Sequence, residues 1–235
     1  MTGPADGLGA VLFDMDGTLV DTEVLWWRTT EEVALGLGHR LGEADAPEVV
    51  GRAVEDTAAH LVRVSGGGDP YAVAAALTGD FFRRVEAGAP MRPGADRLLT
   101  ALHAQGVPFA LVSASPRVVV DSVVGGSLAH VPFAFTLSAD DTELTKPHPD
   151  PYRSAAGRLG LDARACVAVE DSPDGAASAE AAGCGVLVVP SLLAVPATRV
   201  RTFARSLEEV TPELLRACLR AGTGSRRPPS EHPCG

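Results

Sequence analysis

The chain has 235 residues, of which 46% are hydrophobic and 21% are charged, a balance typical of a globular protein and unlike that of disordered or collagen-like chains. Its formal net charge of −10 gives no general attraction for nucleic-acid backbones or anionic membranes. The sequence has neither an uninterrupted run of eighteen apolar residues nor the pattern of a signal peptide. We therefore expect a cytoplasmic monomer that binds neither nucleic acid nor a membrane.

Five short apolar runs are typical of strands buried on both faces of a parallel sheet. They cover residues 8–13, 107–112, 133–137, 166–169 and 185–189. Helical patterns alternate with the later runs, at residues 93–104, 116–124, 150–159 and 173–182, and most of them begin at a proline. This alternation predicts an α/β fold with a doubly wound, Rossmann-like parallel sheet.

Residues 19–92 contain no comparable strand pattern and instead predict helices at 24–37, 55–64 and 70–87. We interpret them as a helical domain inserted into an α/β core domain formed by residues 1–18 and 93–220. The final segment, residues 221–235, is rich in glycine, proline and serine, a composition that predicts a disordered tail.

Polar residues follow the predicted strands at their carboxyl ends, where open α/β sheets bind their ligands. In chain order these residues are Asp14, Asp16, Ser113, Lys146, Glu170 and Asp171. Carboxylates can hold Mg²⁺, whereas hydroxyl and ammonium groups can bind phosphoryl oxygens. Each residue alone is more typical of a solvated turn or a helix cap, but their joint occurrence favours a site for a metal ion and a phosphate.

Four segments resemble the motifs of the haloacid dehalogenase-like phosphohydrolases: DMDGTLVDTE, LVSAS, KPHPDPY and VEDSPDGAASAEAAG. The resemblance covers roughly residues 8–215. The place of the helical insertion is similar to that of the cap in the subgroup that includes β-phosphoglucomutase, phosphoglycolate phosphatase and sugar-phosphate phosphatases. The resemblance implies a Mg²⁺-dependent phosphohydrolase that acts on a small phosphate ester, such as a sugar phosphate, through an aspartyl-phosphate.

The resemblance also implies roles for the acidic residues. Asp14 would be the nucleophile, and Asp16 would be the general acid and base. Mg²⁺ would be held by the Asp14 carboxylate, the Asp16 backbone carbonyl, and the carboxylates of Glu170 and Asp171.

The phosphoryl group would be bound by Ser113, by the backbone amide of Ala114 and by Lys146, which would balance the charge between the phosphoryl group and the nucleophile. Lys146 is the only lysine in the sequence, and the other nineteen basic residues are arginine. An ammonium poised between carboxylate and phosphate is not replaced by a planar guanidinium, so this composition supports the motif.

The cap favours a phosphatase over a β-phosphoglucomutase-like mutase, which remains the alternative. Mutase-like sequences resemble this chain around residues 51–57 but carry an arginine where Val54 stands. Arg52 is the candidate cap residue for substrate binding in its place, whereas Trp26 and Trp27 are expected to pack within the cap. A non-catalytic binding module is a third, less favoured reading, because the motif residues are all present.

Overall fold

Six strands form one sheet in the computed structural model, which describes residues 7–50 and 52–223. They are β1 (Ala10–Phe13), β2 (Phe109–Val112), β3 (Thr136–Leu137), β4 (Cys166–Glu170), β5 (Gly185–Val188) and β6 (Arg201–Phe203). Their order is β3-β2-β1-β4-β5-β6, and every neighbouring pair is parallel. The predicted α/β fold with a doubly wound sheet is therefore confirmed, with one strand more than the sequence indicated.

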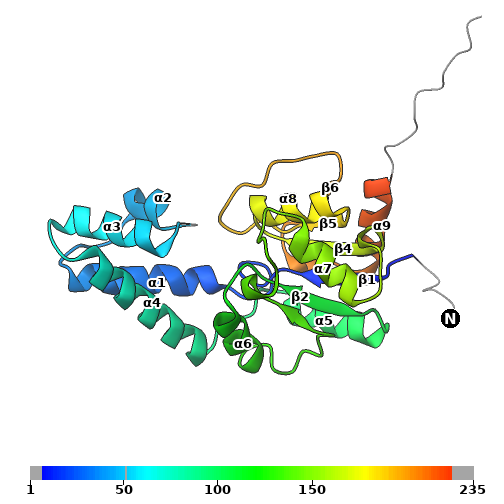
Figure 1. The fold of residues 1–235 in the computed structure, drawn as a ribbon, viewed down its shortest axis with the longest axis horizontal. Helices are drawn as coiled ribbons and strands as arrows, with labels where there is room; N and C mark the ends of the chain where they lie inside the picture. The colour runs from blue at the N-terminus through cyan, green and yellow to red at the C-terminus, as the bar shows by residue number, and fades with distance from the viewer. Residues whose placement is uncertain (1–6, 51, 224–235) are drawn as a thin grey trace, which may run out of the picture.

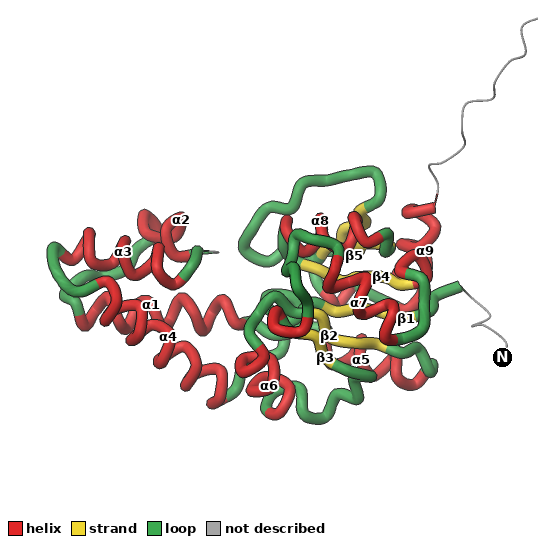
Figure 2. Tube along the Cα trace, in the orientation of Figure 1, coloured by secondary structure: helices red, strands yellow, loops and turns green. Residues whose placement is uncertain are grey.

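The central strands are apolar throughout because helices cover both faces of the sheet (Figures 1 and 2). Val11 and Phe13 of β1 pack on one face, while Ala10 and Leu12 pack on the other. The first face carries α5 (Ala95–Ala104), α6 (Arg117–Gly125) and α9 (Pro212–Thr223), and the second carries α7 (Asp150–Arg158) and α8 (Pro173–Ala182). Residues that alternate along a strand point to opposite faces, so a strand enclosed in this way needs an apolar residue at every position.

The winding of the sheet reverses between β1 and β4. After β1 the chain builds β2 and β3 on one side of it, and then returns to build β4, β5 and β6 on the other side. Ligands of open α/β sheets bind outside the carboxyl ends of the strands at such a switch point. Here those ends carry Asp14, which follows β1, and Glu170, which ends β4.

The insertion forms a helical lobe of its own, at the left of Figure 1. It contains α1 (Thr22–Gly36), α2 (Ala46–Val49), α3 (Val54–Ser65) and α4 (Pro70–Ala87), with a separate apolar cluster between them. The segments that enter and leave the lobe are paired: the Asp21 amide donates to the Pro90 carbonyl and the Arg92 amide to the Leu19 carbonyl, each at 2.8 Å. This paired connection joins the lobe to the sheet next to Asp14.

Among the described strands and α-helices, three were not predicted from the sequence: β6, α2 and α9. β6 is a three-residue edge strand that is only partly buried, and α2 is a single turn, so neither carries a long apolar pattern. Helix α9 runs to Thr223, and the remainder of the segment for which a disordered tail is predicted, residues 224–235, lies outside the described residues. In the part of the chain that the structure describes, no helix combines the length and apolar character needed to cross a membrane.

We expect Leu111→Ala to destabilise the protein by about 2–5 kcal/mol, because the fully buried Leu111 lies in β2 between β1 and β3 and its truncation leaves a cavity. The matched change Leu144→Ala removes the same atoms from a side chain that is 48% exposed and should cost less than about 0.5 kcal/mol. Urea denaturation of the two variants measures the difference. Equal losses of stability would contradict the central placement of β2.

Candidate active site

Asp14 is fixed at the end of β1 with one carboxylate oxygen left unpartnered. Its backbone amide donates to the Val169 carbonyl of β4 at 3.0 Å, and its side chain is buried. Oδ1 accepts a hydrogen bond from Lys146 Nζ at 2.6 Å, whereas the buried Oδ2 has no hydrogen-bond partner among the described residues. Leaving a buried polar atom unsatisfied is costly, so this oxygen is available to a ligand.

The ammonium of Lys146 links the ends of three strands. Besides Asp14, it donates to Glu170 Oε1 at 2.7 Å and to the carbonyl of Val112, at the end of β2, at 2.8 Å. Its side chain is 4% exposed, and each of its three N–H groups thus has an acceptor. Burial alone lowers the pKa of a lysine, but the carboxylates of Asp14 and Glu170 outweigh it and raise the pKa of Lys146 above its ordinary value.

Three carboxylates form an acidic cluster at the switch point. Asp14, Glu170 and Asp171 each offer an oxygen, and these oxygens lie within 4.8 Å of one another. Burial, followed by repulsion from neighbouring carboxylates, raises the pKa of Asp14 to about 7 and that of Asp171 to about 9, while Lys146 partly opposes the shift. One lysine does not neutralise three carboxylates, so the cluster fits a hard divalent cation such as Mg²⁺.

Glu170 is held from three sides. The hydroxyl of Tyr152 donates to its Oε1, and Ser172 Oγ donates to its Oε2 at 3.2 Å. A Cβ atom at Gly175 would overlap this carboxylate, so the glycine allows the first turn of α8 to pack directly against it. Glu170 therefore has a single fixed orientation within the acidic cluster.

Asp16 lies beside the cluster and is oriented by hydroxyl groups. Its Oδ1 accepts from Thr22 Oγ1 at 2.8 Å, and its Oδ2 accepts from Ser115 Oγ at 2.8 Å and from Ser113 Oγ at 3.1 Å. Thr22 is the first residue of α1, so a hydroxyl from the helical lobe contacts this carboxylate. The orientation of Asp16 consequently depends on both lobes.

The structure brings the predicted motif residues together, and only the contact made by Ser113 differs from the prediction. Lys146, Asp14 and the acidic pair of β4 are in contact or within one cluster. The hydroxyl of Ser113, for which phosphoryl binding is predicted, points to Asp16, and the exposed Ala114 follows it at the end of β2.

Sequence reasoning missed the contacts of Thr22, Ser115 and Tyr152. Each of these residues lies within one of the motif segments. That position was the only indication in the sequence of a contact with the site. Hydroxyl groups at strand ends and helix starts are commonly caps, so their residue type alone did not distinguish a contact with a carboxylate.

Arg52 is not in contact with the motif residues. Its Nε donates to the Pro47 carbonyl at 2.9 Å, and its side chain lines a pocket of about 250 Å³ together with Glu23 and Trp26. Trp26 donates from Nε1 to the Val49 carbonyl at 2.9 Å and packs edge-on against Phe81. Trp26 therefore belongs to the packing of the helical lobe and also borders this pocket.

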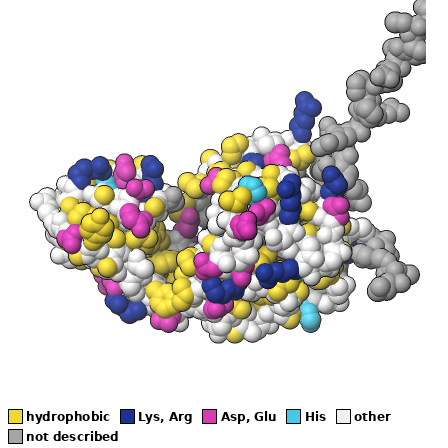
Figure 3. All heavy atoms as spheres, in the orientation of Figure 1, with side chains coloured by type: hydrophobic (Ala, Val, Ile, Leu, Met, Phe, Trp, Pro, Cys, Tyr) yellow, Lys and Arg dark blue, Asp and Glu magenta, His cyan; other side chains and the backbone are white. Residues whose placement is uncertain are grey.

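A larger pocket, of about 650 Å³, opens between the two lobes, where Figure 3 shows a hollow in the surface. Trp27 of α1 and Val50 of the helical lobe face Ser191 and Leu192 from the loop between β5 and β6. The pocket has the size and mainly apolar walls of a small-molecule site.

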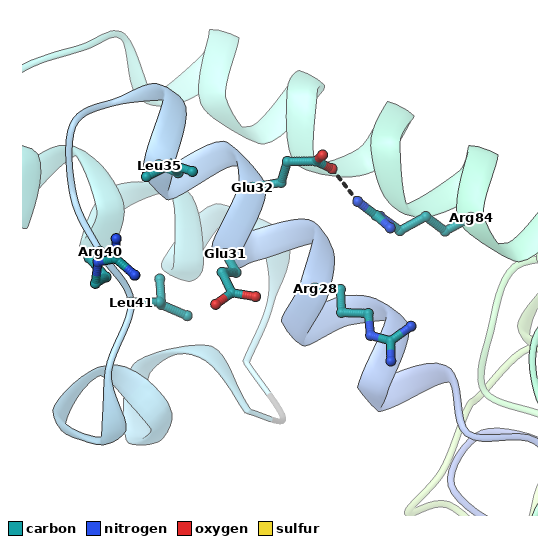
Figure 4. A pocket seen from close by; sticks show the side chains of 7 residues that line it. All are labelled: Arg28, Glu31, Glu32, Leu35, Arg40, Leu41 and Arg84. Atoms are coloured by element: carbon teal, nitrogen blue, oxygen red, sulfur yellow. Dashed lines mark hydrogen bonds and ion pairs between the residues drawn. The ribbon is translucent and has the colours of Figure 1, made fainter.

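A further pocket, of about 380 Å³, lies on the helical lobe and contains none of the motif residues (Figure 4). Its lining is of mixed charge and includes Arg28, Glu31 and the ion pair between Glu32 and Arg84.

Comparisons with known proteins agree with this geometry. The family model for haloacid dehalogenase-like hydrolases matches residues 8–183. Hexitol phosphatase B from Escherichia coli (strain K12) is 30% identical over 185 residues, which are 77% of this chain and 83% of that protein.

Two solved structures are similar over most of their length. A HAD family hydrolase from Deinococcus radiodurans R1, with bound phosphate and sodium, has a TM-score of 0.72 and 28% identity over 92% of this chain and 97% of that chain. CbbY from Rhodobacter sphaeroides, in complex with phosphate, has a TM-score of 0.67 and 25% identity over 86% of this chain and 96% of that chain.

The raised pKa values of Asp14 and Asp171, about 7 and about 9, predict that a divalent cation binds more tightly as the pH rises. Each carboxylate ligates in its ionised form, so proton release opposes binding more strongly at lower pH. We expect the Mg²⁺ affinity measured by calorimetry to increase about tenfold or more between pH 6 and pH 8.5.

Thermal unfolding provides an independent measurement of the same effect. An aspartate in the unfolded chain ionises near pH 4, so its raised pKa in the folded state makes the metal-free protein lose stability as the pH rises from about 4 towards 9. Mg²⁺ should offset this loss, and its stabilising effect should be larger at pH 8.5 than at pH 6. An effect independent of pH would contradict cation binding at the acidic cluster.

Proposed function

The chain belongs to the haloacid dehalogenase-like hydrolase family, and we propose that it is a Mg²⁺-dependent phosphatase of a small phosphorylated metabolite such as a sugar phosphate. The observation that carries the proposal is the unpartnered Oδ2 of Asp14 beside the acidic cluster. Hexitol phosphatase B supports it as a relative, as do the two similar structures that hold phosphate. Small phosphate esters match the size of the pocket between the lobes.

In the proposed first step, Asp14 Oδ2 attacks the phosphorus atom of the ester. The bond from phosphorus to the leaving oxygen breaks, and Asp16, which enters this step in its protonated form, gives that oxygen its proton, which leaves an alcohol and an aspartyl-phosphate. The ammonium of Lys146, 2.6 Å from the other oxygen of Asp14, holds the attacking carboxylate in position.

In the second step, Asp16 takes a proton from a water molecule, which then attacks the aspartyl-phosphate. Inorganic phosphate leaves, and the Asp14 carboxylate is restored. Hydrogen bonds from Thr22, Ser113 and Ser115 orient Asp16 for both transfers. Because Thr22 belongs to α1, placement of the helical lobe controls the acid and base, as closing lids do in many enzymes.

The remaining motif residues would bind the metal ion and the phosphoryl group. Mg²⁺ would be held by the Asp14, Glu170 and Asp171 carboxylates and by the Asp16 carbonyl, and when bound it would neutralise the phosphoryl oxygens. Ser113, the Ala114 amide and Lys146 would bind the phosphoryl group itself. In this role Ser113 must share its hydroxyl between the substrate and Asp16.

A phosphosugar mutase remains the alternative function, and the cap argues against it. A mutase must retain a bisphosphate while it turns over in the site, which requires cationic groups that hold the second phosphate. Val54 stands where mutase-like sequences have arginine, and the guanidinium of Arg52 is engaged with the Pro47 carbonyl. We therefore favour hydrolysis over transfer between two positions of a sugar.

We expect the protein to release inorganic phosphate from members of a panel of sugar phosphates and polyol phosphates when Mg²⁺ is present. Asp14→Asn should lower this activity about 10³-fold or more, because a carboxamide cannot form the acyl-phosphate. A phosphate-release assay measures both. Near wild-type activity of the variant, with deamidation excluded by mass spectrometry, would contradict the proposed nucleophile.

A separate reaction tests the alternative that the protein is a mutase. β-Glucose 1-phosphate with a trace of the 1,6-bisphosphate would then yield glucose 6-phosphate faster than any panel member releases phosphate.

The contacts of Asp16 and Asp171 predict different effects of their substitution. Asp16→Asn should lose most of the turnover while its Mg²⁺ affinity stays within about tenfold of wild type, because only its backbone would ligate the metal. Asp171→Ala removes a carboxylate of the acidic cluster and should weaken Mg²⁺ binding itself. Calorimetric titration distinguishes the two, and equal losses of affinity would contradict this division of roles.

A further inference from the structure

Glu23 stands between two cavities next to the proposed active site. It follows Thr22 in the first turn of α1 and lines both the 650 Å³ pocket between the lobes and the 250 Å³ pocket that contains Arg52. No other described residue lines both of these pockets. Its carboxylate accepts a hydrogen bond, at 3.2 Å, from Ser191 Oγ in the loop between β5 and β6. This contact joins the helical lobe to the core beside the space for the substrate.

Ser191 also lies close to the acidic cluster. A Cβ atom at Gly17 would overlap the carboxylate of Asp171 and would lie 3.3 Å from Ser191 Oγ. The Ser191 hydroxyl and the Asp171 carboxylate therefore both lie against Gly17. An ester whose phosphorus meets Asp14 would place its leaving group within reach of Glu23 and Ser191.

The charge of Glu23 is not balanced by an ion pair. No arginine, lysine or histidine in the described part of the chain forms an ion pair with it, and Arg92, which lines the same pocket, faces Asp21 at 3.5 Å. Burial raises the pKa of Glu23, while the hydrogen bond from Ser191 and the charge of Arg92 oppose the rise. A carboxylate with one hydrogen bond can accept further bonds from hydroxyl groups, and its charge repels another anion.

The pocket as a whole also has more acidic than basic residues in its lining. Its charged lining residues are the acids Asp21, Glu23 and Glu43 and the bases Arg28 and Arg92. The acids are in excess even before the neighbouring acidic cluster is considered, so the pocket offers no excess positive charge for an anion.

We propose that Glu23 and Ser191 determine which leaving group the enzyme accepts. They bind a hydroxyl of an uncharged alcohol next to the scissile ester, and they exclude leaving groups that carry a carboxylate or a second phosphate at that position. This inference rests on the proposed phosphatase function. It also disfavours retention of a bisphosphate, because a second phosphate that reached Arg52 would meet Glu23 in the same pocket.

The test compares esters that differ only in the exchange of a hydroxymethyl group for a carboxylate. Suitable pairs are 2-hydroxyethyl phosphate with 2-phosphoglycolate, and glycerol 3-phosphate with 3-phosphoglycerate. We expect wild-type kcat/KM to favour the uncharged member of each pair about 20-fold or more, mainly through KM, and Glu23→Gln to lower this preference about tenfold. The glutamine keeps an acceptor for Ser191, so only the charge is removed.

Glu31→Gln is the matched control. It removes the same charge from the same helix at a residue of the pocket on the helical lobe (Figure 4), and it should leave the preference unchanged. Ser191→Ala should raise KM for the uncharged esters more than it lowers kcat. Each preference compares two substrates on one protein sample, so a partly unfolded variant does not imitate the effect.

The outcomes separate this inference from the proposed function. A wild-type enzyme that hydrolyses the carboxylate esters as well as their uncharged partners, or a Glu23→Gln variant with an unchanged preference, would overturn the role of Glu23 and leave the phosphatase intact. Failure to hydrolyse any ester would overturn both.

Discussion

The buried negative charge at the junction of β1 and β4 is the constraint on which the rest of the site depends. Carboxylates removed from water are unstable unless they are paired, and one lysine contacts two of them, Asp14 and Glu170. Because Lys146 also bonds the carbonyl at the end of β2, the same interaction fixes the relative positions of three strand ends. The carboxylates that it leaves unpaired favour a cation, which is the basis of the proposed Mg²⁺ site.

The first turn of α1 couples the helical lobe to this charge. Thr22 contacts Asp16, and the next residue, Glu23, contacts Ser191 of the core. The paired backbone segments that connect the lobes lie directly before and after the helical insertion. A rotation about this connection would therefore change the orientation of the proposed acid and base together with the contact that faces the leaving group. Lobe movements of this kind exclude water and complete catalytic sites.

The sequence predicts most of this fold because strands enclosed on both faces must be apolar at every position. It does not predict β6 or α9, since an edge strand of three residues has no apolar run and the helix stood outside the strand and helix alternation. For the site, the rule that ligands meet strand ends correctly groups Asp14, Lys146 and Glu170. The contacts of Tyr152 and Thr22 depend on how α7 and α1 are rotated against the sheet, and residue spacing along one chain does not determine that rotation.

The use of a single lysine follows from the geometry of its acceptors. At position 146, three oxygen atoms converge on one nitrogen that is almost completely buried, and an ammonium presents its three donors from one point. The acceptors around Arg117 are instead spread over two nitrogens: its Nη1 contacts Asp121, and its Nη2 contacts Asp141. A guanidinium has five donors in a plane, and in the space around Asp14 it would leave buried N–H groups without acceptors. A chain that otherwise uses arginine therefore retains lysine where its charge must reach Asp14, the proposed nucleophile.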